Sequence, residues 1–243
     1  MSDHQFDEQY FHSEAYADVS FSRFSQYWWS NRYYAMLSMR YGPNSGRVLE
    51  IGCGLGHLLG WLASDFFVVG VDINAWALSQ AQANVPQGNF CLLTAEDLSA
   101  FTSNSFHLII AKHVLEHLSD PVSSIAEMSR ILAPGGVLIV ATPNLDSPMR
   151  KLKQEHWIGY KDPTHISMKP PQEWLQIIKA QGLNPLKVFS DGFWDAPYVP
   201  LVPVILQKLF FGLPGGLQAV FGWGIIPVRM GESLIVVAKK PDG

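Results

Sequence analysis

Short apolar runs alternate with helix-length segments along most of this chain, and the alternation predicts an α/β fold with a mainly parallel sheet. Two further observations support it: a glycine-rich turn directly after the first run, and an acidic residue at the end of the second. Seven runs have the length and composition of strands, so we expect a seven-stranded sheet with helices on both faces. At 243 residues the chain suits one large domain.

The expected strands occupy the chain from residue 47 onward. They read, in order, RVLEI, FVVGVD, NFCLL, FHLIIA, GGVLIVAT, PLKVFS and SLIVVAKK. A helix is expected before the sixth run, because Pro170 and Pro171 suit a helix start and Gly182 suits a helix end. Residues 47–243 are therefore the predicted main domain.

Residues 1–46 precede the first strand and are rich in aromatic side chains. Their spacing is typical of an amphipathic helix that ends before Gly42 and Pro43, so we expect an N-terminal helical cap. Its rings would either cover the core or contact a bound ligand, and both roles stay open. They include Tyr27, Trp28, Trp29, Tyr33 and Tyr34.

The overall composition excludes several classes of protein. A hydrophobic content of 48% with 16% charged residues is not that of a disordered chain. A net charge of -4 provides no broad basic field, so no long nucleic acid is expected as a partner. Cys53 and Cys91 lack disulfide or metal spacing, and the polar, acidic first residues do not resemble a signal peptide. We therefore expect a cytoplasmic protein.

The glycine-rich turn VLEIGCGLGHLL is the strongest motif of the chain. Gly52, Gly54 and Gly56 follow the first expected strand, where glycines let the backbone wrap closely around a ligand. Asp72 ends the second strand, where a carboxylate can accept both hydroxyls of an adenosine ribose. A nicotinamide dinucleotide also has such a ribose, but its G-x-G-x-x-G pattern needs a glycine at the position of His57. The spacing therefore disfavours an NAD-dependent oxidoreductase.

With Glu50 two positions before the first glycine, VLEIGCGLG resembles motif I of class I S-adenosylmethionine-dependent methyltransferases. VDIN, LTAEDL, FHLIIAKHVLEHLSDP and RILAPGGVLIVATPN resemble later motifs of that family, in the same order, between about residues 47 and 190. The resemblance implies a Rossmann-like fold and S-adenosylmethionine as cofactor.

The resemblance also implies a role for each cofactor residue. Glu50 would orient the methionine amino group, Asp72 would bind the ribose, and Asp97 would accept from the adenine amino group. The glycines would approach the methionine moiety, Ile73 would pack on adenine, and the backbone of Glu96 and Leu98 would line its pocket. Two purely structural roles stay open, a helix cap for Asp97 and a backbone contact for Glu50. The full set is Glu50, Gly52, Cys53, Gly54, Gly56, Asp72, Ile73, Glu96, Asp97 and Leu98.

Candidate reacting groups follow the fourth strand, in KHVLEH. His113, Glu116 and His117 would converge if this stretch forms one helical turn, and His165 in DPTHIS could complete the set. The pattern resembles the metal site of small-RNA 2'-O-methyltransferases and the related region of ubiquinone-pathway O-methyltransferases. Both carry E-x-x-E-H here, and this chain departs from that pattern at His113.

Two functions of these histidines stay open. Three imidazoles and one carboxylate would hold Zn, Mn or Fe rather than Mg, so a divalent metal is possible. A metal-free role for His117, His165 or His113 as general base is favoured, because imidazole titrates near physiological pH. Glu116 would then only fix the loop. His156 and Trp157, on the same expected loop as His165, would border the acceptor.

An apolar insertion, about residues 193–230, precedes the last strand, and Lys208 is its only charged residue between Asp195 and Arg229. Segment 209–228 is as long as a membrane span, but Pro214, Pro227 and five glycines are expected to break a straight helix. We expect an interfacial or acceptor-covering element. A buried helical pair and a homodimer contact are the alternatives.

These patterns together predict an S-adenosylmethionine-dependent methyltransferase, by preference one that methylates a hydroxyl of a small-molecule or lipid-linked acceptor. Peripheral membrane contact and a homodimer are possible. One alternative is a cofactor-binding module at a membrane surface that has lost catalysis. Another is a metal-dependent enzyme similar to 2'-O-methyltransferases, and whether O, N or C is methylated stays open.

Overall fold

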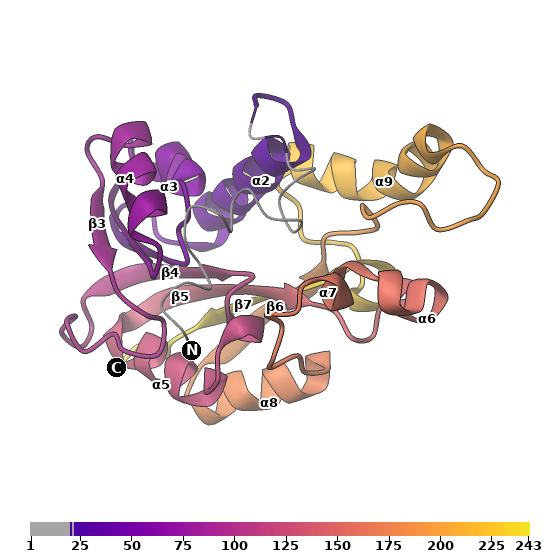
Figure 1. The fold of residues 1–243 in the computed structure, drawn as a ribbon. Helices are drawn as coiled ribbons and strands as arrows, with labels where there is room; N and C mark the ends of the chain where they lie inside the picture. The colour runs from indigo at the N-terminus through magenta and orange to yellow at the C-terminus, as the bar shows by residue number, and fades with distance from the viewer. Residues whose placement is uncertain (1–19, 21) are drawn as a thin grey trace.

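The computed structural model describes residues 20 and 22–243, which form a seven-stranded sheet with helices on both faces (Figure 1). The strand order is β3-β2-β1-β4-β5-β7-β6, and only β7 runs antiparallel to its neighbours. The mainly parallel, Rossmann-like sheet expected from the sequence is confirmed. The strands are β1 (Gly46–Ile51), β2 (Phe66–Asp72), β3 (Asn89–Leu92), β4 (Phe106–Lys112), β5 (Leu132–Pro143), β6 (Asn184–Ser190) and β7 (Ser233–Lys239).

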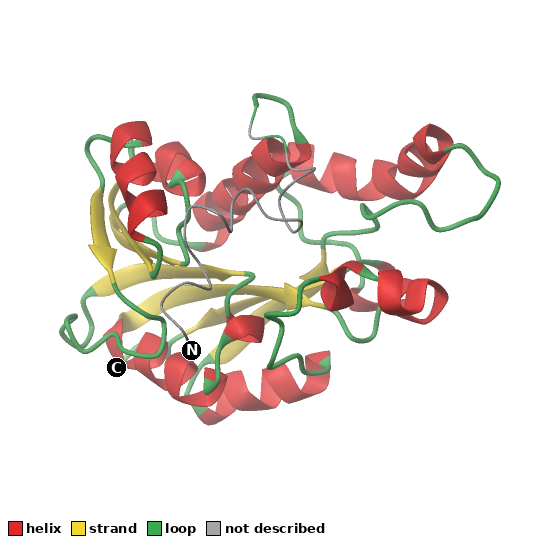
Figure 2. Ribbon diagram, in the orientation of Figure 1, coloured by secondary structure: helices red, strands yellow, loops and turns green. Residues whose placement is uncertain are grey.

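The central strands are apolar on both faces because each face is covered by helices (Figure 2). Alternate residues of β1 point to opposite faces of the sheet and so belong to different hydrophobic cores. Leu49 and Ile51 lie in one core, and Val48 lies in the other. One face is covered by α2 (Gln26–Tyr41), α3 (His57–Leu62) and α4 (Ala75–Asn84), and the other by α5 (Pro121–Ile131) and α8 (Pro171–Ala180).

The parallel arrangement brings the carboxyl ends of six strands to one edge of the sheet. The chain segments that follow β1, β2 and β3 lie beside one another there, next to those that follow β4, β5 and β6. Helices α6 (Pro148–Lys153), α7 (Ile158–Lys161) and α9 (Val204–Phe221) project beyond this edge on the right of Figure 1.

Helix α2 begins where the Ser25 side chain accepts a hydrogen bond from the Trp28 amide, and it ends at Tyr41, before Gly42. The helix expected within residues 1–46 is thus confirmed, and Tyr33, Tyr34 and Leu37 are buried in the core. Residues 1–19 and 21 of the expected cap lie outside the described residues.

The apolar insertion differs from two sequence expectations. Its α9 is one continuous helix with Pro214 inside it, so the expected break at this proline is wrong. Proline removes one amide donor, and the carbonyl that loses it belongs to Phe210, an exposed residue. The alternative of a buried helical pair is also wrong, because Gln207 and Gln218 are the only fully buried side chains of α9.

Candidate active site

The turn after β1 has the backbone geometry that the glycine pattern predicts. Gly52, Gly54 and Gly56 all have positive φ, between 49° and 73°, and Gly56 immediately precedes α3. A Cβ at Gly52 would lie 2.5 Å from a methyl of Val114, so a larger residue does not fit. The amides of Gly52 and Cys53 both donate to the Val71 carbonyl, at 2.8 and 3.1 Å, which ties the turn to β2.

Asp72, at the end of β2, organises this turn. Its two oxygens accept from the backbone amides of Gly54, at 2.8 Å, and Asn74, at 3.0 Å. Burial raises the pKa of Asp72, and these two hydrogen bonds oppose that effect. Each carboxylate oxygen accepts more than one hydrogen bond, so the group can hold the turn and accept a ligand hydroxyl together. Ile73 beside it is 48% exposed, an apolar side chain open to a planar ligand.

Glu50 is buried next to a lysine that the sequence analysis did not single out. Lys112 ends β4, the strand beside β1, and donates to the Asn31 side chain of α2 at 3.1 Å. Its ammonium also faces the rings of Tyr27 and Tyr34 at 5.5 and 5.2 Å. Burial raises the pKa of Glu50 to about 8 and lowers that of Lys112 to about 8, and each charge favours the ionised form of the other. One oxygen of Glu50 has no hydrogen-bond partner.

The loop after β3 carries the expected adenine-binding residues in three different environments. Asp97 is exposed and accepts from the Ser99 amide at 3.0 Å. Glu96 instead accepts from Ser119 and from the Asp120 amide, and so ties this loop to the start of α5. Leu98 is fully buried in the core. Of these three residues, Asp97 is the exposed one whose carboxylate is not bound to another segment.

The segment after β4 brings three of the four expected reacting residues together. Potential ligand atoms of Glu116, His117 and His165 lie within 4.8 Å of one another, and the two imidazole rings are 4.7 Å apart. Within this segment, the 3-10 turn includes only Leu115–His117. His113, which precedes the turn, has a left-handed backbone with φ of 53°. Consequently His113 lies outside this group, although its Nδ1 is 3.1 Å from Glu116 Oε1.

The hydrogen bonds of the two imidazoles define which nitrogen carries the lone pair. Thr164 donates to Asp162 at 2.5 Å, so its oxygen accepts from Nδ1–H of His117 at 2.7 Å. Nδ1–H of His165 donates to the Gly159 carbonyl at 2.7 Å. In the neutral rings the lone pairs are therefore on the Nε2 atoms. Burial lowers the pKa of His117, which favours the neutral ring.

Glu116 adds a buried carboxylate to these lone pairs. Burial would raise its pKa, but the hydrogen bond from His113 and the nearby imidazoles outweigh burial and hold the pKa below its ordinary value. Glu116 is fully buried, and its Oε2 has no hydrogen-bond partner. A buried carboxylate oxygen without a partner is costly unless a cation or a donor reaches it, so the set fits a divalent ion or a bound hydroxyl.

Comparison with known proteins identifies the family. Residues 26–188, more than half of the chain, match the family model described as a methyltransferase domain. The chain belongs to this methyltransferase family. Membership confirms the resemblance that the glycine-rich motif and the four later motifs indicated.

This chain matches individual relatives over part of their length. It is 31% identical over 166 residues to the ubiquinone biosynthesis O-methyltransferase of Cereibacter sphaeroides, a match that covers 61% of this chain and 66% of that protein. It is 30% identical over 147 residues to the protein of the same name from a Caulobacter species, over 57% and 56% of the two chains. The chain thus spans about half to two thirds of the length of these relatives.

Solved structures agree on the fold of this chain. A SAM-dependent methyltransferase from Archaeoglobus fulgidus superposes with a TM-score of 0.61 at 19% identity, over 86% of this chain and 94% of that one. An S-adenosylmethionine-dependent methyltransferase from Mesorhizobium loti superposes with a TM-score of 0.59 at 18% identity, over 86% and 98%. At these identities the likeness shows the fold alone.

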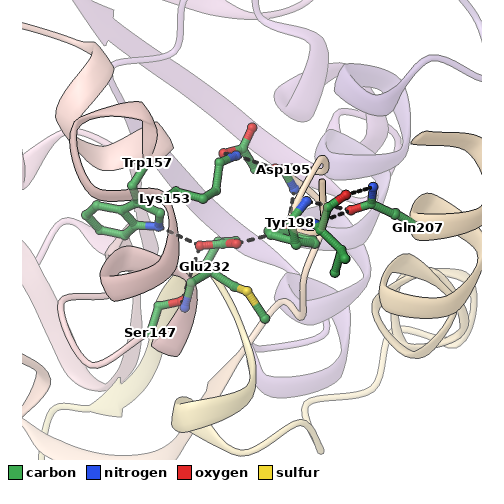
Figure 3. Close-up of polar contacts among 9 residues, drawn as sticks. Ser147, Lys153, Trp157, Asp195, Tyr198, Gln207 and Glu232 are labelled. Atoms are coloured by element: carbon green, nitrogen blue, oxygen red, sulfur yellow. Dashed lines mark hydrogen bonds and ion pairs between the residues drawn. The ribbon is translucent and has the colours of Figure 1, made fainter. Parts of the chain in front are cut away.

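A second polar network surrounds Glu232 (Figure 3). Its carboxylate accepts from the Trp157 indole at 2.6 Å and from the Tyr198 hydroxyl at 2.9 Å, and Lys153 pairs with Asp195 beside it. Trp157 is therefore buried in a structural contact, and the expectation that it borders the acceptor is wrong. His156, also expected there, is a largely exposed residue. The network joins the α6–α7 segment to the loop before α9.

Proposed function

We propose that the chain is an S-adenosylmethionine-dependent O-methyltransferase that acts on a hydroxyl group of a small apolar or lipid-linked molecule. The single observation that carries this proposal is the cluster of two imidazoles and one buried carboxylate, on His117, His165 and Glu116. Glu116 and His117 follow β4, and the neighbouring strand β1 leads into the glycine turn. The names of the curated relatives support the choice of oxygen as the methylated atom.

The cofactor would lie across the carboxyl ends of β1, β2 and β3. Asp72 would accept from its ribose hydroxyls, Asp97 from its adenine amino group, and Ile73 would cover one face of the adenine. The methionine end carries an ammonium and a carboxylate. Glu50 and Lys112 are buried groups whose charges each favour the ionised form of the other, so we assign the ammonium to Glu50 and the carboxylate to Lys112.

Methyl transfer needs alignment and removal of one proton. Bound S-adenosylmethionine would supply its methyl group to the acceptor oxygen in line and would be released as S-adenosylhomocysteine. The hydroxyl proton passes to Nε2 of His117, whose Nδ1–H is held by Thr164 and Asp162. His113 would position Glu116 through the hydrogen bond between them.

A divalent ion would fit the same group, with Glu116, His117 and His165 as its ligands. Two nitrogen donors and one carboxylate favour Zn, Mn or Fe over Mg. Such an ion would lower the pKa of a bound hydroxyl and so favour its ionised form. The unpartnered Oε2 of Glu116 is the specific observation in favour of a metal.

The test is methyl transfer from radiolabelled S-adenosylmethionine to a catechol with a long alkyl chain, with and without EDTA. Label in the organic phase is the expected result, and it should disappear when His117 is replaced by Ala. Retained activity in EDTA assigns His117 as the base, whereas loss in EDTA and recovery with Mn or Zn assigns the metal. Cofactor binding without transfer to any hydroxyl acceptor would contradict the proposal and favour a binding module.

A further inference from the structure

Helix α9 has both of its glutamines on the inside and most of its apolar residues on the outside. Gln207 and Gln218 are each 1% exposed, whereas Ile205 and Phe210 are 74 and 75% exposed. The two glutamines are eleven residues apart, about three helical turns, and so lie on the same face. A surface helix of a globular domain normally has the reverse arrangement.

The inner glutamines attach α9 to the loops on either side of it. Gln207 accepts from the amides of Tyr198 and Val199, at 2.5 and 2.8 Å, and donates to the carbonyls of Val199 and Val202. Gln218 donates to the Ser190 carbonyl at 2.7 Å and accepts from two amides of the loop after the helix. Both amide side chains are thus used to fix the helix.

The C-terminal end of α9 is attached to α2. Arg32 donates to the carbonyls of Ala219 and Val220, and Arg40 donates to that of Phe221. The hydroxyl of Tyr33 donates to the Trp223 carbonyl at 2.7 Å. The network around Glu232 fixes the loop before the helix (Figure 3). With both ends attached, the helix cannot turn over to bury its apolar face.

The outer face of α9 is a continuous apolar stripe. At about 100° per residue, it lies opposite the two glutamines. Its side chains are between 39 and 74% exposed. The loop before the helix continues the surface with Leu201, which is fully exposed. The stripe consists of Ile205, Leu209, Leu213, Leu217 and Val220. In length and hydropathy, α9 also matches a membrane-crossing helix.

The charges next to this stripe are positive. A cavity of about 290 Å³ between α2 and the end of α9 is apolar except for Arg40. A second cavity, of about 170 Å³ along the first half of α9, is lined by apolar residues together with Lys208 and Gln26. Residues 196–228 include no Asp or Glu. Each half of the helix therefore has a cation beside an apolar hollow.

We propose that α9 docks in the plane of an anionic lipid bilayer, with its apolar stripe among the acyl chains and Lys208 and Arg40 near the lipid phosphates. The fixed inner face holds the helix along the surface rather than across it. A second copy of this chain fits less well, because a twofold contact would bring cations against cations without an acid to pair them. This docking does not depend on methyl transfer. Its consequence, that a lipid-linked acceptor reaches the strand ends from the bilayer, rests on the proposed function.

Vesicle co-sedimentation of the full chain, without cofactor or acceptor, tests the proposal. Vesicles of 70% phosphatidylcholine and 30% phosphatidylglycerol should bind the protein, and pure phosphatidylcholine should bind it several-fold less. Leu209→Ser with Leu213→Ser should reduce binding at least tenfold, and Lys208→Glu about fivefold or more. Leu186→Ser, at an equally exposed leucine of β6, is the matched control and should bind like the parent chain.

Each variant is checked by its affinity for S-adenosylhomocysteine, which should stay at the parent value because the cofactor residues lie on other segments. The proposal is overturned if the parent chain stays in the supernatant at all lipid concentrations, or if the stripe variant binds as well as the control. It is also overturned if light scattering shows a dimer that the stripe variant abolishes, since a second copy then covers the face. Methyl transfer could fail in any of these cases without affecting the sedimentation result.

Discussion

The site at the carboxyl ends of the strands has two halves, one after β1–β3 and one after β4–β6, and the two halves are built in different ways. At β1–β3 the backbone forms most of the site: positive-φ glycines, strand ends and one carboxylate that binds two amides. At β4–β6 the site consists of side chains from distant segments, since Glu116 and His117 meet His165 from a loop almost fifty residues further on. The first half is thus defined locally and the second only by the complete fold.

This difference predicts that the two halves can be disabled separately. The largest expected effect belongs to His117→Ala, which removes the proposed proton acceptor. Turnover should fall by roughly 10²- to 10⁴-fold, while the affinity for S-adenosylmethionine changes little. Initial rates with the alkyl catechol and calorimetric titration of the cofactor measure the two quantities. Equal loss of both would mean that the halves are not separate.

Lys112→Met tests whether the β4 end also contributes to the cofactor half. If Lys112 binds the methionine carboxylate, S-adenosylhomocysteine should bind about 10- to 150-fold more weakly, as for a lost hydrogen bond to a charged group. Methylthioadenosine, which has no carboxylate, should bind the parent and the variant alike. The exposed Lys151→Met is the matched control. A similar loss for both ligands would indicate a folding defect instead.

Asp72→Ala should weaken S-adenosylmethionine binding by about 1 to 3 kcal/mol, because the ribose loses a charged acceptor. Gly54 and Asn74 lose the same acceptor, so the turn should also become less ordered. Calorimetry at constant pH measures the change. An unchanged affinity would remove Asp72 from the proposed cofactor site.

The pH dependence gives the smallest expected effect. Burial lowers the pKa of His117 from its ordinary value of 6.5. The neutral ring should therefore persist at pH values below 6.5. Since only the neutral ring accepts a proton, kcat/KM should be constant near pH 7 and fall as the pH drops through the lowered pKa. A rate profile between pH 5 and 8 measures it. An acid limb centred above 6.5 would contradict the assignment.

The sequence predicted the β1–β3 half of the site better than the β4–β6 half. The turn at Gly52, the role of strand ends and the position of Asp72 were all predicted, because short-range spacing encodes them. Lys112 was missed, although a lysine that ends the apolar run FHLIIA was a signal. The separation of His113 from the other groups was not predictable, because it depends on a left-handed residue. The course of α9 through Pro214 was also missed, since it depends on the tertiary contacts of Gln207 and Gln218.

Calorimetric titration of S-adenosylhomocysteine into a variant with both His117→Ala and His165→Ala tests the division of the site most directly. Both changes lie in the β4–β6 half, and none of the proposed cofactor contacts involves either imidazole. The predicted result is a Kd within about twofold of the parent value, with methyl transfer abolished. A Kd raised tenfold or more, in a variant that still unfolds cooperatively, would contradict the account, because the histidines would then belong to the cofactor site.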